Sequence, residues 1–75
     1  MDIEKAFGEI LKRERTKKSL SQEELAYLSD LDRTFISMLE RGKRQPSLKT
    51  IFVLTSALGI RPSQMLHDIE ELLSF

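Results

Sequence analysis

The sequence contains no cysteine, and this absence removes several kinds of chemistry at once. No disulfide and no thiolate metal site can form, which fits a reducing compartment. Only one histidine, His67, is present, and no glycine-rich phosphate loop occurs. A nucleophile–base pair or a metal cluster cannot be assembled from such a set. We therefore expect no catalysis, no bound metal and no cofactor.

Long apolar runs are also missing. No stretch approaches the roughly 18 apolar residues of a membrane helix, and the N-terminal residues 1–4 lack the pattern of a secretory signal peptide. We expect a cytoplasmic protein with no membrane partner. The 75 residues suffice for one small domain, spanning 1–75. The core of such a domain is marginal, and a dimer interface would supplement it.

The net charge is zero, with 12 basic and 12 acidic residues, but the charges are unevenly distributed. From Arg33 to Arg61 six residues are basic and only Glu40 is acidic, whereas acids gather near both ends of the chain. A local basic surface of this kind suits docking of one face on phosphates. The neutral total predicts only modest nonspecific binding to nucleic acid.

Residues 21–42 carry the signals of two short helices separated by a tight break. Ser21 and Glu24 have the spacing of a capping box, which predicts a helix start. Leu25, Ala26 and Leu28 supply the apolar stripe of this helix. Ser29-Asp30 interrupts it, Asp32 is a good N-cap for a second helix, and Gly42 ends that helix. The spacing is that of a helix-turn-helix motif.

The second helix of this motif has two contrasting faces. At about 100° per residue, Ile36, Leu39 and Glu40 share one side, which we assign to the core. The opposite side carries two arginines, two hydroxyls and a methionine: Arg33, Thr34, Ser37, Met38 and Arg41. Arginine can bond bidentately to guanine, and apolar groups can contact the thymine methyl. The alternative on this segment alone is a solvated helix without acids.

The segments SQEELA and LDRTFISMLERGKRQPSL resemble the lambda/434-repressor-like (Xre-type) helix-turn-helix domain of phage and bacterial regulators. The resemblance covers about Phe7 to Met65. Within that family, AYLSDLDRTFISMLERG is most similar to the small controller proteins of restriction–modification systems, and it also resembles stand-alone regulators. The resemblance implies an all-α fold, a compact five-helix domain that binds DNA.

The resemblance also implies roles for individual positions. It implies base readout from the second motif helix by Arg33, Thr34, Phe35, Ser37 and Met38. Phe35 stands where controller proteins usually carry tyrosine, so the phenolic hydrogen bond is lost. Gln22 matches a phosphate-binding position. We expect further phosphate contacts from the end of that helix and the following loop: Arg41, Lys43, Arg44, Gln45, Ser47 and Lys49. The alternative for the loop is a solvated charged segment.

Glu40 lies on the buried side of the second motif helix, where an isolated carboxylate would be costly. Arg15, on the core-facing side of the first helix, matches the family position that meets this carboxylate. We predict a largely buried Arg15–Glu40 ion pair, whose partners stabilise each other in the interior. The alternative is that each side chain reaches solvent independently.

Three further helices are predicted, at about 3–17, 48–58 and 62–74. Apolar residues cover so much of the circumference of the 48–58 helix that we expect it to be the central core helix. Pro62 suits the first turn of the last helix. The apolar stripe of that helix exceeds what a monomer usually exposes. We assign the dimer contact to Met65, Ile69, Leu72 and Phe75.

These observations predict a homodimeric, sequence-specific transcriptional regulator. Its recognition helices would enter successive major grooves of a pseudo-palindromic operator. The expected partners are operator DNA and a second copy of the chain, with RNA polymerase as a further candidate. No small-molecule ligand is implied. The competing class is a protein-interaction module of antitoxin or anti-repressor type, which the acidic and apolar last helix keeps open.

Overall fold

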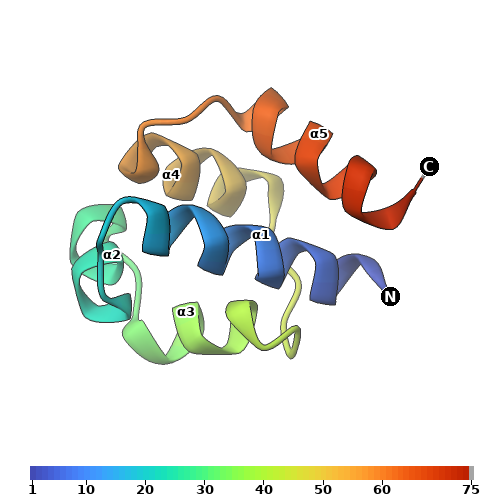
Figure 1. Cartoon of the computed structure of the whole chain (residues 1–75). Helices are drawn as coiled ribbons and strands as arrows, with labels where there is room; N and C mark the ends of the chain where they lie inside the picture. The colour runs from blue at the N-terminus through green and yellow to red at the C-terminus, as the bar shows by residue number, and fades with distance from the viewer. Residues whose placement is uncertain (75) are drawn as a thin grey trace.

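The computed structural model describes residues 1–74, which form five α-helices and no strand (Figure 1). In chain order these are α1 (Ile3–Lys17), α2 (Gln22–Ser29), α3 (Arg33–Glu40), α4 (Leu48–Leu58) and α5 (Pro62–Leu73). The predicted all-α class is confirmed. The last helix ends at Leu73, one residue earlier than expected, because Ser74 adopts a left-handed conformation with φ 61°. Phe75, assigned to the dimer contact, lies outside the described residues.

The N-terminal helix α1 occupies the centre of the molecule, with α3 on one side and α5 on the other (Figure 1). Its buried side includes Phe7, Ile10 and Leu11. Gly8 lies where α1 meets the end of α3: a Cβ atom there would be 2.5 Å from the carbonyl oxygen of Leu39. The absence of a side chain at this position therefore allows the two helix backbones to approach closely.

The expectation that the 48–58 helix is the central core helix is wrong. Leu54 and Leu58 of α4 are buried, but Leu48 is 67% exposed and Phe52 is 55% exposed. The helix packs mainly against α2 and α5, and part of its apolar circumference stays exposed in the monomer. Leu28 of α2, predicted to belong to the apolar stripe, is likewise 54% exposed.

Local hydrogen bonds set the starts of the helices. Ser21 Oγ accepts from the Glu24 amide at 3.0 Å, and the Ser21 amide donates to Glu24 Oε1 at 2.8 Å, which completes the capping box. The Asp32 carboxylate accepts from the Thr34 amide at 2.9 Å and begins α3. Ser47 caps α4 in the same manner. The two predicted N-caps, Ser21 and Asp32, are therefore present.

The placement of α5 corrects part of the predicted dimer contact. Met65 is fully buried and Ile69 is 7% exposed, because α5 packs this side against α1 and α4 within one chain. These two residues belong to the monomer core and are not available to a partner. Leu72 is 37% exposed and Leu66, which the prediction omitted, is 43% exposed.

Candidate nucleic-acid interface

Helix α3 lies at the edge of the bundle and packs against α1 and α2 (Figure 1). Ile36 and Leu39 are fully buried, so the inner face of the helix is as expected. On the other side Arg33 and Thr34 are exposed, and Ser37 and Met38 are half-buried. A row of short polar and apolar groups, with an arginine at the first turn, is thereby presented on one side of the bundle.

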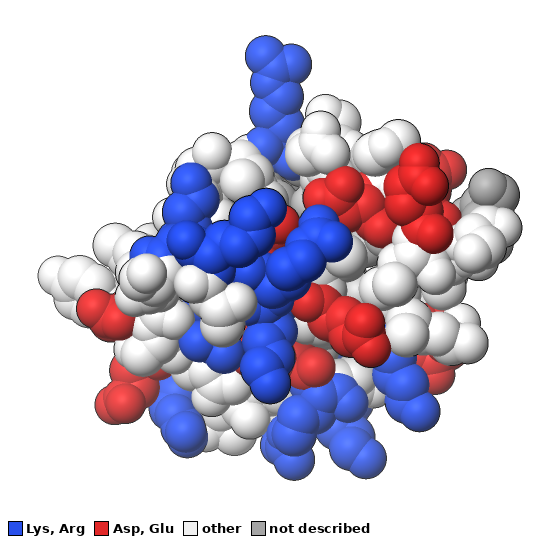
Figure 2. Space-filling view, viewed as in Figure 1, with Lys and Arg blue, Asp and Glu red and all other residues white. Residues whose placement is uncertain are grey.

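The surface of α3 and the loop after it carries no exposed carboxylate after the N-cap Asp32. Between Arg33 and Arg61 the only acidic residue is Glu40, and its side chain is 3% exposed. In Figure 2, basic side chains gather over α1 and along the edge below α3. Acidic side chains gather over α5, and others lie beside the N-terminal half of α1 and over α2. The charges of this neutral chain are therefore unevenly spread over its surface, with acidic groups sparse around α3 and its loop.

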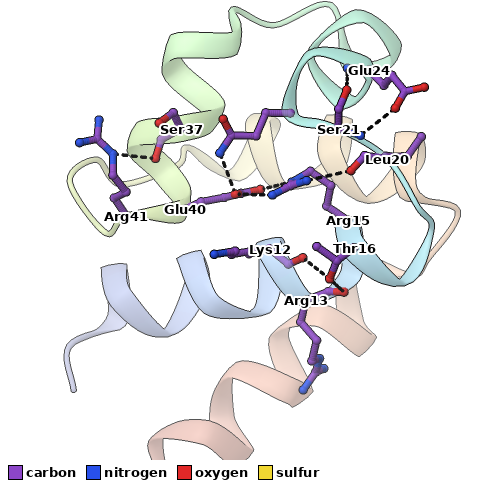
Figure 3. Close-up of polar contacts among 11 residues, drawn as sticks. Lys12, Arg13, Arg15, Thr16, Leu20, Ser21, Glu24, Ser37, Glu40 and Arg41 are labelled. Carbon is purple, nitrogen blue, oxygen red and sulfur yellow. Dashed lines mark hydrogen bonds and ion pairs between the residues drawn. The ribbon is translucent and has the colours of Figure 1, made fainter.

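The buried carboxylate of Glu40 is paired with Arg15 across α1 and α3 (Figure 3). Arg15 Nε donates to Glu40 Oε2 at 2.6 Å, and Arg15 Nη2 donates to Oε1 at 3.0 Å. The remaining Arg15 Nη1 donates to the Leu20 carbonyl at 2.8 Å, which ties down the α1–α2 loop. The hydrogen bonds to Glu40 raise the pKa of Arg15 above its ordinary value, while burial opposes this.

Gln22, which was expected to contact phosphate, also binds Glu40 and so joins the Arg15–Glu40 pair. Its Nε2 donates to Glu40 Oε1 at 2.9 Å, which joins the start of α2 to the end of α3. A side-chain amide has two N–H groups, so one remains for another acceptor. The contact between Gln22 and Glu40 was not predicted, because no local sequence pattern relates positions that far apart.

The loop after α3 is anchored on the helix it leaves. Gly42 has φ 72°, a left-handed conformation that favours glycine. The Gly42 amide donates to the Leu39 carbonyl at 3.1 Å, and the Lys43 amide donates to the Met38 carbonyl at 2.9 Å. These bonds satisfy carbonyls at the helix end. Beyond them the side chains expected to bind phosphate are exposed: Lys43, Arg44, Gln45, Ser47 and Lys49.

Phe35 is half-buried at the border between the core and the outward face of α3. The guanidinium of Arg44 lies over its ring, with Cζ 5.5 Å from the ring centroid. Arg41 is exposed and its Nε donates to the Ser37 carbonyl at 3.4 Å. The Phe35–Arg44 contact was not predicted, because no local sequence pattern signals it. The close approach at Gly8 was not predicted either, although a glycine inside an apolar helix pattern is a signal for one.

No group of three or more histidine, aspartate or glutamate side chains among residues 1–74 is arranged to hold a metal ion. None of the five helices is both long enough and apolar enough to cross a membrane. His67 is exposed on α5, where its Nε2 lies 3.4 Å from Glu71 Oε1. It takes no part in the α3 surface.

Comparison with known proteins places this geometry in a family. The helix-turn-helix profile matches residues 11–65. Control protein C.MunI from Mycoplasma sp is 45% identical over 71 residues, covering 93% of this chain and 96% of the relative. The crystal structure of the restriction-modification controller protein C.AhdI from Aeromonas hydrophila is similar with a TM-score of 0.79 and 48% identity, covering 81% of this chain and 92% of that one.

A third similarity concerns a protein solved with DNA. The restriction-modification controller protein C.Esp1396I, a tetramer in complex with its natural 35 base-pair operator, matches with a TM-score of 0.86 and 28% identity. The match covers 95% of this chain and 93% of that one. Controller proteins are thus among the relatives of this chain, and one of them, C.Esp1396I, has been crystallised with its operator.

Proposed function

We propose that this chain, which belongs to the helix-turn-helix family, is a sequence-specific DNA-binding transcriptional regulator and the controller protein of a restriction–modification system. The observation that carries the proposal is the outward face of α3 with its loop. That surface offers Arg33 and Thr34 to solvent, while its one carboxylate, Glu40, is buried against Arg15. A helix face of this kind is suited to the major groove, where arginine can bond to guanine.

The proposed mode of binding is a homodimer on a pseudo-palindrome. Each α3 would enter a major groove, and the half-sites would lie about one helical turn, roughly 34–36 Å, apart. We assign base readout to Arg33, Thr34, Ser37 and Met38. Phosphate contacts would come from the second N–H of Gln22 and from exposed groups around the loop: Arg41, Lys43, Arg44, Gln45, Ser47 and Lys49.

Selection of bound duplexes from a random pool tests the proposal. We expect enrichment of a pseudo-palindrome with half-sites about one turn apart. Arg33→Ala should then weaken binding of the enriched duplex by about 1–3 kcal/mol and relax preference at one base pair. Arg61→Ala is the matched control, because Arg61 precedes α5, which α1 separates from α3. A pool without enrichment would refute sequence-specific binding and favour a protein-interaction module.

Salt dependence separates phosphate contacts from base contacts. Lys43→Ala should weaken specific and random duplexes alike and reduce the slope of log K against log salt concentration by about 1. Arg33→Ala should instead act mainly on the selected sequence. Equal loss on both duplexes for Arg33→Ala would contradict the assignment of this residue to base readout.

The dimer contact is proposed for the exposed side of α5 and the groove beside it. This groove, of about 240 Å³, is lined mainly by apolar side chains from α1, the α3–α4 loop and α5. Ile3, Leu66 and Leu73 supply apolar surface to the groove, and Leu72 lies outside it, 37% exposed on α5. Leu66→Lys should shift sedimentation equilibrium toward monomer. If Phe52→Lys on α4 did so and Leu66→Lys did not, the interface would be the α2–α4 side instead.

Two further expectations belong to this proposal. We propose that the protein acts in the bacterial cytoplasm, where the chromosome and its promoters are accessible to it. We also propose RNA polymerase as a second partner at promoters where the bound protein raises transcription. Transcription in vitro from a template with the selected site tests this, because activation with purified polymerase alone requires contact or altered DNA. No change in transcript amount at saturating protein would exclude the polymerase as a partner.

A further inference from the structure

The cation–π contact between Arg44 and Phe35 joins two segments of the proposed DNA surface. Arg44 Cζ lies 5.5 Å from the Phe35 ring centroid, within the roughly 6 Å over which a ring face attracts a cation. Phe35 belongs to the first turn of α3, and its ring packs partly against the core. Arg44 belongs to the loop that follows α3. One half-buried ring therefore contacts both the interior and a loop cation.

The backbone next to Arg44 is already held in place. The left-handed Gly42 reverses the chain direction after α3, and the Lys43 amide is bonded to the Met38 carbonyl at 2.9 Å. The long arginine side chain would otherwise sample many rotamers, and ordering it on binding would cost entropy. A contact that holds its head group in the free protein reduces that cost.

The ring holds the guanidinium without neutralising it. No carboxylate among residues 1–74 forms an ion pair with Arg44. Arg15 is different: its N–H groups donate to Glu40 and to the Leu20 carbonyl, so its charge and donors are already used. The attraction between a ring face and a cation does not require the guanidinium N–H groups to bond to an oxygen. The charge and the N–H groups of Arg44 stay available to an anion.

We propose that Phe35 is a positioning residue, whose ring holds Arg44 beside α3 for contact with DNA. What this position supplies is an aromatic face for the arginine, and a phenolic hydroxyl is not required. This inference rests on the proposed DNA binding, and it gives Phe35 a role through Arg44 in place of direct base readout.

The first test needs no DNA. In the free protein, NMR signals of the Arg44 side chain should be shifted upfield by the ring current of Phe35. Phe35→Met keeps a similar apolar volume without a ring, so it should abolish the shift, and Phe35→Tyr should retain it. Tyr27→Leu, which removes an exposed ring from α2, is the control and should leave Arg44 unchanged. Identical Arg44 signals in all variants would overturn the proposal.

The second test is a double-mutant cycle on binding to the selected duplex. Phe35→Met should weaken binding about two- to fivefold, the range expected for an exposed cation–π contact. It should have no further effect in an Arg44→Gln background, and Phe35→Tyr should bind like the parent. An equal effect of Phe35→Met in both backgrounds would mean that the ring contacts DNA by itself, and would refute the positioning role.

Separate controls test whether each variant folds and whether the parent protein binds DNA. The thermal midpoint of each variant shows whether it is folded, and Phe35→Leu replaces Phe35→Met in the cycle if the methionine variant is not. If the parent protein selects no duplex, the proposed function fails. The ring-current measurement then still decides whether Phe35 holds Arg44.

Discussion

Breaking the buried pair between Arg15 and Glu40 should have a large effect on stability. The two side chains are only 11% and 3% exposed. Arg15→Met removes three hydrogen bonds, two to Glu40 and one to the Leu20 carbonyl. The Glu40 carboxylate would then stay buried with Gln22 as its remaining partner. Losing one partner of such a pair typically costs about 3–5 kcal/mol.

This cost is large relative to the whole domain. At about 0.05–0.15 kcal/mol per residue, 75 residues give a total stability of roughly 4–11 kcal/mol. A loss of 3 kcal/mol or more should lower the midpoint of thermal unfolding by at least about 12 °C in a domain of this size. Urea titration followed by circular dichroism measures the change in free energy directly.

The double variant Arg15→Met/Glu40→Leu makes the reasoning refutable. Because no charge is then stranded, it should be more stable than either single variant by at least about 2 kcal/mol. Arg13→Met is the control: it breaks the ion pairs of the 49% exposed Arg13 with Asp68 and with Glu14, and Glu14 keeps Lys17 as a partner. It should cost at most about 1 kcal/mol. Single variants as mild as this control, or a double variant that simply adds the two losses, would show that the pair is not coupled as described.

Three other substitutions test the packing and the caps. Gly8→Ala should destabilise the fold by about 1–3 kcal/mol, although alanine has the better helix propensity. The reason is that the new Cβ would lie 2.5 Å from the Leu39 carbonyl oxygen. An unchanged midpoint of thermal unfolding would contradict this close approach. Ser21→Ala should cost about 1 kcal/mol in urea titration by removing the α2 cap. Met65→Ala should cost about 2–5 kcal/mol because the side chain is fully buried; loss of dimer at unchanged monomer stability would instead place Met65 at the interface.

The helix boundaries could be predicted from the sequence because their causes are local. Ser21 and Glu24 bond to each other within one turn, and Asp32 bonds to an amide two residues on. Gly42 and Gly59 adopt positive φ immediately after their helices. Such contacts join residues at most four positions apart, so residue type and spacing are sufficient to identify them. The inner face of α3 was predictable for the same reason.

The side of each helix that is buried could not be predicted reliably where the apolar stripe is wide. On α5, Met65 is buried and its neighbour Leu66 is 43% exposed, although both are apolar. On α4, Phe52 is 55% exposed because α2 and α5, the main neighbours of that helix, leave this side uncovered. A periodic pattern identifies apolar sides, but the positions of the neighbouring helices decide which of them is covered.

The sequence by itself determined five helices, their ends, and a basic segment whose one acid was expected to be buried. Those features depend on hydrogen bonds within a turn and on the order of charges along the chain. Only the tertiary structure decided that Gln22 shares Glu40 with Arg15 and that Arg44 lies over Phe35. Both contacts form between different segments, and their distances follow from how α1, α2, α3 and the loop pack, which no local pattern encodes.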